Sequence, residues 1–267
     1  MNTSEKHTPL ITIITPAYNA EHFITDAIES VLKQTYTDWE MIIVDDHSTD
    51  RTIEKVHAYI KQDDRITLIQ LGENSGSAVA RNRAINAARG RFIAFLDSDD
   101  LWVPEKLEKQ LAFMLDRDIA FSFTEYARMK EDGGLLKSNI RAPETVDYNG
   151  LLKHCVIGCL TVMIDMDKTG RVQMIDLRAR QDYVLWLTLT KKGFLAYGLP
   201  EELAIYRIVK NSISSNKLKM ARRNWNVYRR IERQGFFQSI WYILHYAVHY
   251  TCRLLPKSRS PRKNTKG

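Results

Sequence analysis

Two carboxylates separated by one residue follow a strongly apolar stretch of the chain. Residues 92–96 are all apolar, and Asp97, Ser98, Asp99 and Asp100 come directly after them. In an extended backbone Asp97 and Asp99 point to the same side, because side chains alternate along a strand. Such a pair at the end of a buried strand can hold a hard divalent cation, which in turn binds phosphate oxygens. An isolated pair is more commonly a solvated acidic turn, so its meaning depends on the elements around it.

The first hundred residues alternate between predicted strands and predicted helices. Apolar, β-branched runs predict strands at residues 10–15, 39–44, 66–71 and 91–97, and helical spacing predicts helices at 21–34, at about 49–60 and at 78–88. This alternation is typical of an open, mostly parallel α/β sheet of Rossmann-like type, with helices on both faces. Parallel strands end at one edge, where ligands bind. That edge should collect Tyr18, Asp46, Asn74, Arg81, Asp97 and Asp99.

The second half has a more mixed pattern. We expect helices at residues 104–117, 148–155 and 181–192, and strands at 119–129, 135–140, 159–164 and 203–206. These elements should complete the sheet and build the other wall of a cleft. A length of 267 residues suits one substantial core with an appendage. We therefore expect a catalytic domain at residues 1–216 and a basic helical segment at residues 217–267.

Charge is distributed unevenly between these two parts. The total of +7 combines +12 over residues 217–267 with −5 over the first 216 residues. Residues 217–233 predict a basic helix, and residues 236–255 predict a helix with a wide apolar face and one polar stripe. An apolar face flanked by cations suits a helix lying in the interface of an anionic membrane. The tail at residues 257–267 is predicted to be disordered.

The basic segment also has two other readings. Its cations could contact nucleic-acid phosphates, or its helix could serve for homodimerisation. Its aromatic residues lie within an apolar helix face rather than in a polar groove, which favours lipid over nucleic acid. The N-terminus has no apolar signal region, and no apolar run is long enough for a spanning helix. The three cysteines suit a reducing compartment. We expect a cytoplasmic protein associated peripherally with the inner face of the cell membrane.

Six segments together resemble glycosyltransferase family 2, the inverting nucleotide-sugar transferases of GT-A fold. They are Thr-Pro-Ala-Tyr-Asn at 15–19, Val-Asp-Asp-His-Ser-Thr-Asp at 44–50, Asn-Ser-Gly with Ala-Arg-Asn within 74–82, Asp-Ser-Asp-Asp at 97–100, Gln-Asp-Tyr with Trp within 181–186, and Tyr-Arg with Ser-Ile-Ser within 206–214. Each is weak alone, but their order and spacing across residues 9–216 make a strong signal. Residues 100–107 look like bacterial enzymes that build cell-surface polysaccharides, teichuronic-acid-type transferases among them. His47 departs from the glycine usual at that position.

The resemblance implies a nucleotide-sugar donor, with a UDP-sugar expected. The matching donor-binding residues are Pro16, Tyr18, Asn19, Asp46, Asn74, Arg81, Asp97, Ser98, Trp102 and Arg207. Pro16, Tyr18 and Asp46 would line the base pocket, where Asp46 either accepts an imide N–H or serves only as a turn carboxylate. Arg81 would reach the base or the diphosphate. Trp102 would stack on a sugar or lie in the core, and Arg207 would hold the diphosphate or stay at the surface.

The chemistry implied by the resemblance is displacement at an anomeric carbon by an acceptor hydroxyl. Mn²⁺ or Mg²⁺, bound by Asp99 directly and by Asp97 nearer the ribose, would stabilise the charge that develops on the departing phosphate. Asp182 is the candidate base for the hydroxyl, with helix capping as the alternative. The predicted function is sugar transfer to a lipid-linked or polysaccharide acceptor in cell-surface glycan synthesis. The alternative is a non-catalytic nucleotide-binding or nucleic-acid-binding protein that uses the basic segment.

Overall fold

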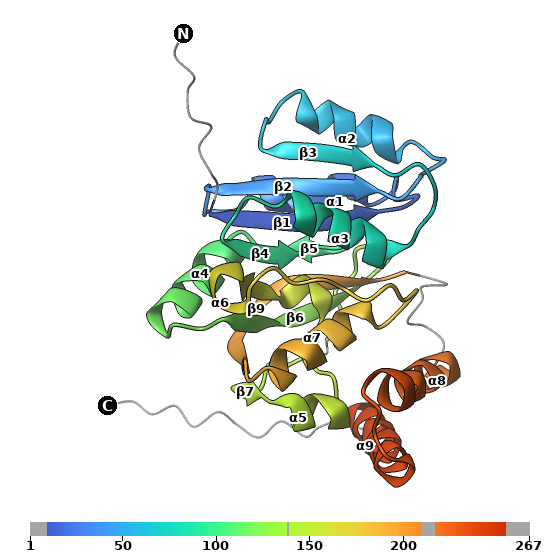
Figure 1. The fold of residues 1–267 in the computed structure, drawn as a ribbon. Helices are drawn as coiled ribbons and strands as arrows, with labels where there is room; N and C mark the ends of the chain where they lie inside the picture. Colours follow the sequence, from blue (N-terminus) through green and yellow to red (C-terminus); the bar gives the residue numbers. More distant parts are fainter. Residues whose placement is uncertain (1–9, 138, 210–216, 255–267) are drawn as a thin grey trace.

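A computed structural model describes residues 10–137, 139–209 and 217–254, which are arranged as a sheet with helices on both faces (Figure 1). Within these residues the strand order is β3-β2-β1-β4-β8-β6-β9-β5, and β7 pairs with β9. The strands are β1 (Ile11–Ala17), β2 (Trp39–Asp45), β3 (Ile66–Gln70), β4 (Phe92–Phe95), β5 (Leu101–Trp102), β6 (Phe121–Lys130), β7 (Thr145–Val146), β8 (Met163–Asp165) and β9 (Ala196–Ile208).

The helices lie between these strands and after β9. They are α1 (Ile24–Leu32), α2 (Thr52–Ile60), α3 (Ser77–Ala87), α4 (Lys106–Asp116), α5 (Tyr148–Lys153), α6 (Met166–Thr169), α7 (Gln181–Lys191), α8 (Lys217–Asn226) and α9 (Phe236–Leu254), with a 3-10 turn at Cys159–Thr161 and a π-helical turn at Val227–Ile231. The predicted polar loop at 211–214 and the basic tail at 257–267 lie outside the described residues.

The four N-terminal strands are parallel, as the sequence predicted. In the register of β1 with its neighbours, Ala17 lies beside Asp45 and Ile14 lies beside Phe95. The carboxyl ends of β1, β2 and β4 therefore meet at one edge of the sheet, which is where the predicted site residues follow the strands.

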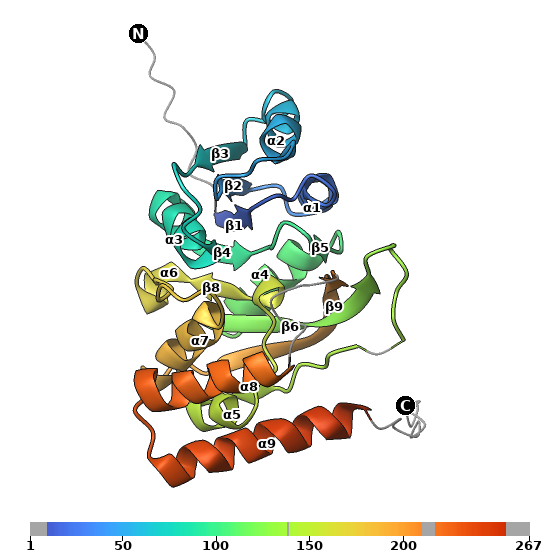
Figure 2. The ribbon, with the colours of Figure 1, turned by 90° about the vertical axis from the view of Figure 1, so that its right-hand side faces the viewer.

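Side chains alternate between two cores on the two faces of this sheet. Ile14 and Phe95 pack in the core covered by α3, α5 and α7. Ile13 and Ala94 pack in the core covered by α1, α2 and α4. Figure 2 shows these two helical layers on opposite sides of the strands. Burial on both faces explains why the strands read as nearly continuous apolar runs.

The second half of the sheet contains parallel and antiparallel strands. Three of its elements differ from the sequence prediction. Strand β8 lies antiparallel between β4 and β6, whereas β6 and β9 are parallel. The strand predicted at 203–206 is the end of the longer β9, and the one predicted at 159–164 begins as a 3-10 turn. The strand predicted at 135–140 was wrong, because the described residues of this segment make isolated bridges to β6 rather than a continuous ladder. Leu135 is 65% exposed.

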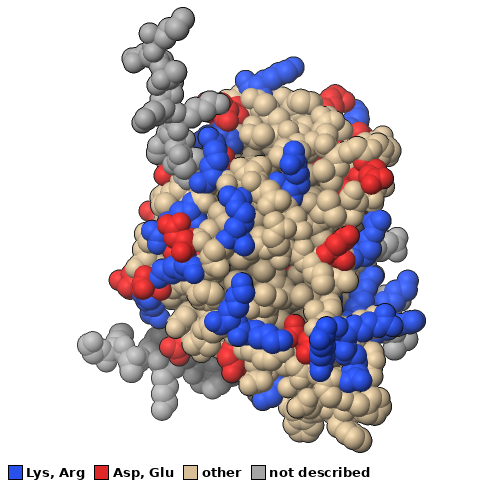
Figure 3. Space-filling model, in the orientation of Figure 1, with Lys and Arg blue, Asp and Glu red and all other residues tan. Residues whose placement is uncertain are grey.

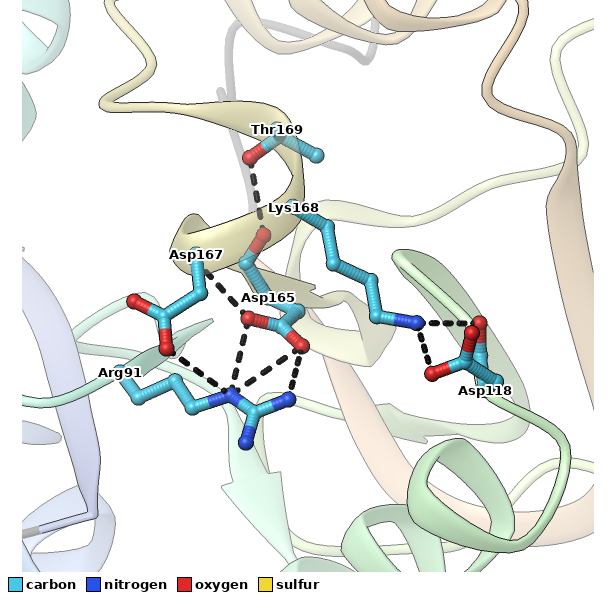
Figure 4. A network of polar contacts seen from close by, with 6 residues as sticks. All are labelled: Arg91, Asp118, Asp165, Asp167, Lys168 and Thr169. Carbon is cyan, nitrogen blue, oxygen red and sulfur yellow. Dashed lines mark hydrogen bonds and ion pairs between the residues drawn. The ribbon is translucent and has the colours of Figure 1, made fainter.

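A network of charged residues fixes β8 to β4 at the edge opposite the carboxyl ends of the parallel strands. Figure 4 shows Arg91 reaching the buried carboxylate of Asp165, with Arg91 Nη2 and Asp165 Oδ2 2.7 Å apart. Asp165 also accepts the backbone N–H of Asp167 at 3.0 Å, and Lys168 pairs with Asp118. The network ties the start of β4 to α6 and to the loop before β6.

The C-terminal helices pack against the body of the protein. The Tyr228 hydroxyl donates to the Leu152 carbonyl at 2.9 Å, and the Tyr148 hydroxyl donates to Glu232 at 2.7 Å. Rings of Tyr228 and Tyr242 lie 5.6 Å apart. Within the described residues, no helix is both long and apolar enough to cross a membrane. The domain boundary after residue 216 stays a prediction, and the segment beyond it shares its packing with α5.

Gly90 offers a test of how closely the segment before β4 approaches β1. A Cβ at Gly90 would lie 2.7 Å from the Thr12 backbone nitrogen and 2.8 Å from the Ile11 carbonyl carbon. Because these backbone atoms belong to a central strand, we expect Gly90→Ala to lower the free energy of unfolding by about 2–3 kcal/mol. Urea denaturation measures the change. Gly72→Ala, with nothing within 4 Å, is the matched control; equal effects of the two substitutions would contradict the close approach.

Candidate active site

A cavity of about 620 Å³ opens at the edge where the parallel strands end. Its lining includes residues that follow β1, β2 and β4, residues of α3, and the start of α7. The predicted site residues that it brings together are Pro16, Tyr18, Asp46, Arg81, Asp97, Ser98, Asp99 and Asp182. Asn19, Asn74, Trp102 and Arg207 do not line the cavity. The carboxylates at 97, 99 and 182 therefore share one hollow, although they come from different halves of the chain.

Tyr18 stands at the rim of the cavity on a loop held in place by its neighbour. Asn19 adopts a left-handed backbone with φ of 46°. Its side-chain oxygen accepts the Thr49 N–H at 2.8 Å, and its own N–H donates to the Ser48 hydroxyl at 2.9 Å. The β1–α1 and β2–α2 loops are thus joined, which leaves the Tyr18 ring 51% exposed and able to pack against a ligand.

Asp46 is buried and organises the loop before α3. Its two carboxylate oxygens accept the N–H groups of Ser75 at 2.7 Å and Gly76 at 2.8 Å. The Asn74 side chain donates to the Asp46 carbonyl at 3.2 Å. Gly76 has a φ of 97°, which an L side chain rarely adopts. Asp46 therefore serves as a turn carboxylate, and it also lines the cavity, where each oxygen keeps a second lone pair.

Arg81 and Asp97 form an ion pair in the floor of the cavity. Arg81 is 5% exposed, and its Nη2 contacts the Asp97 carboxylate. Burial alone would lower the pKa of the guanidinium, but Asp97 and other acidic neighbours raise it, so Arg81 stays charged. Its Nε and Nη1 are buried with no hydrogen-bond partner. An unpartnered buried donor is costly, and an oxygen-rich ligand would satisfy these two.

The remaining carboxylates of the Asp97–Asp100 segment are crowded and partly desolvated. Burial, and then the charge of Asp97, raise the pKa of Asp99 to about 6. Burial also raises the pKa of Asp100 well above its usual range. Asp100 accepts the Arg207 N–H at 2.9 Å through Oδ1, while Oδ2 is buried without a partner. A bound cation would offset the electrostatic repulsion between the carboxylates of Asp97 and Asp99.

Trp102 and Arg207 were predicted to bind the nucleotide sugar, but neither lines the cavity. Trp102 is buried, its Nε1 donates to the Leu160 carbonyl at 2.8 Å, and Lys106 Nζ lies 3.9 Å from its ring centre. Arg207 is also buried, donating to the Asp99 carbonyl at 2.9 Å and to the Asp26 carboxylate at 2.8 Å. Trp102 thus matches the core alternative. Arg207 is neither at the surface nor in the cavity, and it braces the loop that carries Asp99.

The cavity lining also contains two arginines that the sequence did not predict as site residues. Arg178 and Arg180 line the cavity directly before Gln181 and Asp182. Arg180 has a φ of 72° at the start of α7. Gln181 donates to the Ser77 hydroxyl at 2.8 Å, which ties the start of α7 to the start of α3. Two cationic residues immediately before a carboxylate motif were the available signal in the sequence.

Two carboxylates are the ligands available for a divalent cation. Among the described residues there is no cluster of three or more His, Cys, Asp or Glu that could hold a metal ion alone. Asp97 and Asp99 line the same cavity, and Mg²⁺ commonly binds through one or two carboxylates together with substrate phosphates and water. The donor set therefore fits a cation shared with a phosphorylated substrate.

Comparisons with known proteins agree with this architecture. A family model described as Glycosyl transferase family 2 matches residues 12–167. A Bacillus subtilis (strain 168) protein, named as the teichuronic acid biosynthesis glycosyltransferase TuaG, is 55% identical over 90% of this chain and 95% of its own length. An Escherichia coli protein named UDP-Glc:alpha-D-GlcNAc-diphosphoundecaprenol beta-1,3-glucosyltransferase WfgD is 41% identical over 90% of this chain and 92% of its own length.

Solved structures share the fold at lower identity. The mannosyltransferase PcManGT from Pyrobaculum calidifontis, in complex with GDP-Man and Mn²⁺, has a TM-score of 0.65 at 17% identity, covering 95% of this chain and 77% of that chain. S. aureus TarS 1-349 in complex with UDP-GlcNAc has a TM-score of 0.64 at 21% identity. This match covers 82% of this chain and 66% of that chain. The sheet and its helical layers are therefore shared with these two solved structures.

The raised pKa of Asp99 predicts that the free energy of unfolding of the metal-free protein falls as the pH rises. Because this pKa is about 6 in the folded state and about 4 in the unfolded chain, folded protein binds more protons between these values and loses stability as pH rises through them. Asp99→Asn should raise the free energy of unfolding at pH 8 by up to about 3 kcal/mol and by less at pH 5. Urea denaturation in EDTA measures both values.

The exposed Asp116 of α4 provides the control for this experiment. Asp116→Asn is expected to change the free energy of unfolding by less than about 0.5 kcal/mol at either pH. A gain for Asp99→Asn of the same size at pH 8 and pH 5 would contradict the assigned ionisation.

Proposed function

The chain belongs to glycosyl transferase family 2, and from this premise we propose that it transfers a sugar from a UDP-sugar to a hydroxyl of a lipid-linked or polysaccharide acceptor in cell-surface glycan synthesis. The observation that carries the proposal is the shared cavity of Asp97, Asp99 and Asp182. The names of relatives that act in teichuronic acid biosynthesis and on a diphosphoundecaprenol-linked sugar support the class of acceptor.

The nucleotide end of the donor would lie against the residues that follow β1 and β2. Tyr18 offers an exposed ring and Asp46 offers carboxylate lone pairs to an imide N–H, with Pro16 beside them. The diphosphate would lie over Arg81, whose two unpartnered buried donors match phosphate oxygens. Asn19 and Asn74 would act indirectly, by holding the loops that carry Tyr18 and Asp46.

Asp99 and Asp97 would hold Mn²⁺ or Mg²⁺ against the diphosphate. Bound there, the cation would act as a Lewis acid for the departing phosphate. Asp99 has no ion-pair partner among the described residues, whereas Asp97 is shared with Arg81. This difference favours Asp99 as the direct ligand. Arg207 would contribute by fixing the Asp99 backbone through the bond to its carbonyl.

Asp182 would take the proton from the acceptor hydroxyl as that oxygen attacks the anomeric carbon. It lies at the second position of α7 and lines the same cavity as Pro16 and Tyr18. Attack by the acceptor oxygen from the side opposite the leaving diphosphate would invert the configuration at the anomeric carbon. The hydrogen bond from Gln181 to Ser77 would keep this carboxylate at a fixed distance from the donor wall.

The C-terminal segment, taken as a separate unit after residue 216, would bind an anionic membrane. Phe237 and Trp241 of α9 are 84% and 56% exposed. Figure 3 shows Lys and Arg gathered over α8, above an uncharged surface that follows α9. The basic residues near these helices are Lys219, Arg222, Arg223, Arg229, Arg230 and Arg233. Aromatic residues beside cations suit the headgroup region of a bilayer.

A screen of nucleotide sugars with the Asp182→Asn variant tests the catalytic proposal. One UDP-sugar should support release of UDP that needs both Mn²⁺ or Mg²⁺ and an acceptor. Asp182→Asn should reduce transfer by about 10²–10⁴-fold, because it removes the general base, while donor affinity stays within about twofold. Calorimetry measures donor binding.

The exposed Asp176, outside the cavity lining, provides the matched control, and Asp176→Asn should keep wild-type turnover. Near-normal turnover of Asp182→Asn would exclude Asp182 as the base. A complete absence of sugar transfer by the wild type from any nucleotide sugar would contradict the proposed function.

Vesicle binding tests the membrane proposal. Phe237→Glu combined with Trp241→Glu should reduce co-sedimentation with vesicles containing phosphatidylglycerol by about tenfold or more, because the apolar face would then carry charge. Leu115→Glu, at an exposed leucine of α4, is the control and should bind as wild type does. Unchanged vesicle binding of the double variant, with loss of a dimer in sedimentation velocity, would assign this face to homodimerisation instead.

A further inference from the structure

Arg180 is a cavity residue with no assigned partner. It lies two positions before Asp182 and lines the same cavity. We propose that Arg180 binds a phosphate group of the acceptor, so that the favoured acceptor is a sugar carried on a lipid diphosphate rather than an uncharged glycan. This inference rests on the proposed function and adds a residue that selects the acceptor.

Among the described residues, Arg180 lacks the polar side-chain partner that each of the other cavity arginines has. Arg81 pairs with Asp97, and Arg178 donates to the Asn74 side chain at 3.0 Å. In the part of the chain that the structure describes, Arg180 makes no ion pair, and its Nε is buried with no hydrogen-bond partner. An unpaired guanidinium facing a cavity attracts an anion, and phosphate oxygens match its planar donors.

The position of Arg180 favours the acceptor over the donor. Arg178 reaches the Asn74 loop that Asp46 organises, which is the proposed nucleotide end. Arg180 instead lies 5.5 Å from the ring centre of Tyr183 and 6.0 Å from that of Tyr246, which belongs to α9. Arg180 therefore lies near α9 at the start of the helix that carries Asp182.

The same helix that contacts Arg180 carries the exposed aromatic residues proposed to meet the membrane. Met220 of α8 lines the cavity as well, so α8 forms part of its wall. A phosphate group at the end of a lipid would approach from this side. The diphosphate of the donor would already be matched by Arg81 and a cation, so a second phosphate group needs a cationic partner of its own, and Arg180 supplies it.

Arg180→Asn tests the proposal without disturbing the backbone. Asparagine tolerates the left-handed conformation that Arg180 adopts, with φ of 72°. The acceptors are N-acetylglucosamine linked through a diphosphate to a short alkyl chain, and the same sugar as an uncharged alkyl glycoside. Arg180→Asn should raise KM for the diphosphate acceptor by about 10–100-fold, the effect of losing a charged hydrogen bond. KM for the donor and for the glycoside should stay unchanged.

Two further variants complete the comparison. Arg180→Lys keeps the positive charge and should recover at least half of the loss in KM on a logarithmic scale. Arg117→Asn, at an exposed arginine that ends α4 outside the cavity lining, should keep wild-type KM for both acceptors. Equal effects of Arg180→Asn on the two acceptors would overturn the proposal, as would a wild type that uses both acceptors equally well, although sugar transfer itself would then stand.

A binding measurement separates this inference from the proposed function. Calorimetric titration with the alkyl diphosphate, in the presence of saturating UDP and Mn²⁺, requires no turnover. Binding to the wild type that weakens about tenfold or more in Arg180→Asn supports the site even where no sugar is transferred. Equal affinity of the two proteins, or no binding to the wild type, overturns it.

Discussion

A buried guanidinium against a carboxylate at a strand end is the interaction around which this cavity is built. Arg81 comes from α3 and is buried, whereas Asp97 follows β4 and its side chain is 31% exposed. Removing the Asp97 carboxylate would leave the buried Arg81 guanidinium without a compensating charge, which is costly. Burial, and then the charge of Asp97, raise the pKa of Asp99, and Arg81 Nε and Nη1 are buried without hydrogen-bond partners. This contact and the charged residues Asp99, Asp182 and Arg180 make the cavity polar.

The sequence was sufficient for the sheet and for the residues that follow its parallel strands. β-branched runs ending in Pro16, Asp45 and Asp97 carry their own signal, because strand, stop and polar loop are adjacent in the chain. Trp102 and Arg207 carried no such signal. Their contacts include Leu160 and Asp26, which are distant in sequence, as well as the nearby Lys106. Local pattern thus locates a strand end well, and it says little about what covers a single large side chain.

The C-terminal helices show a second limit of local pattern. Their composition sets them apart from the body, which suggested a boundary after residue 216. The structure nevertheless joins them to the body through Tyr228, Glu232 and Tyr246, and Met220 reaches the cavity. The charge of a segment reflects the solvent or surface that it faces, whereas its packing depends on a few aromatic and apolar side chains. A domain boundary inferred from charge can therefore differ from one inferred from packing.

Hydrogen bonds join α3 to residues 174 and 181, and they limit how segments of this chain can be exchanged with those of homologues. Gln181 bonds to Ser77, and the Asn82 side chain bonds to both backbone groups of Met174, at 2.7 Å and 2.8 Å. These bonds join residues about a hundred positions apart in the sequence. A chimera that swaps only residues 171–182 keeps them only where the new segment places its backbone at position 174 in the same way and has a donor at position 181, so the two segments are best exchanged together.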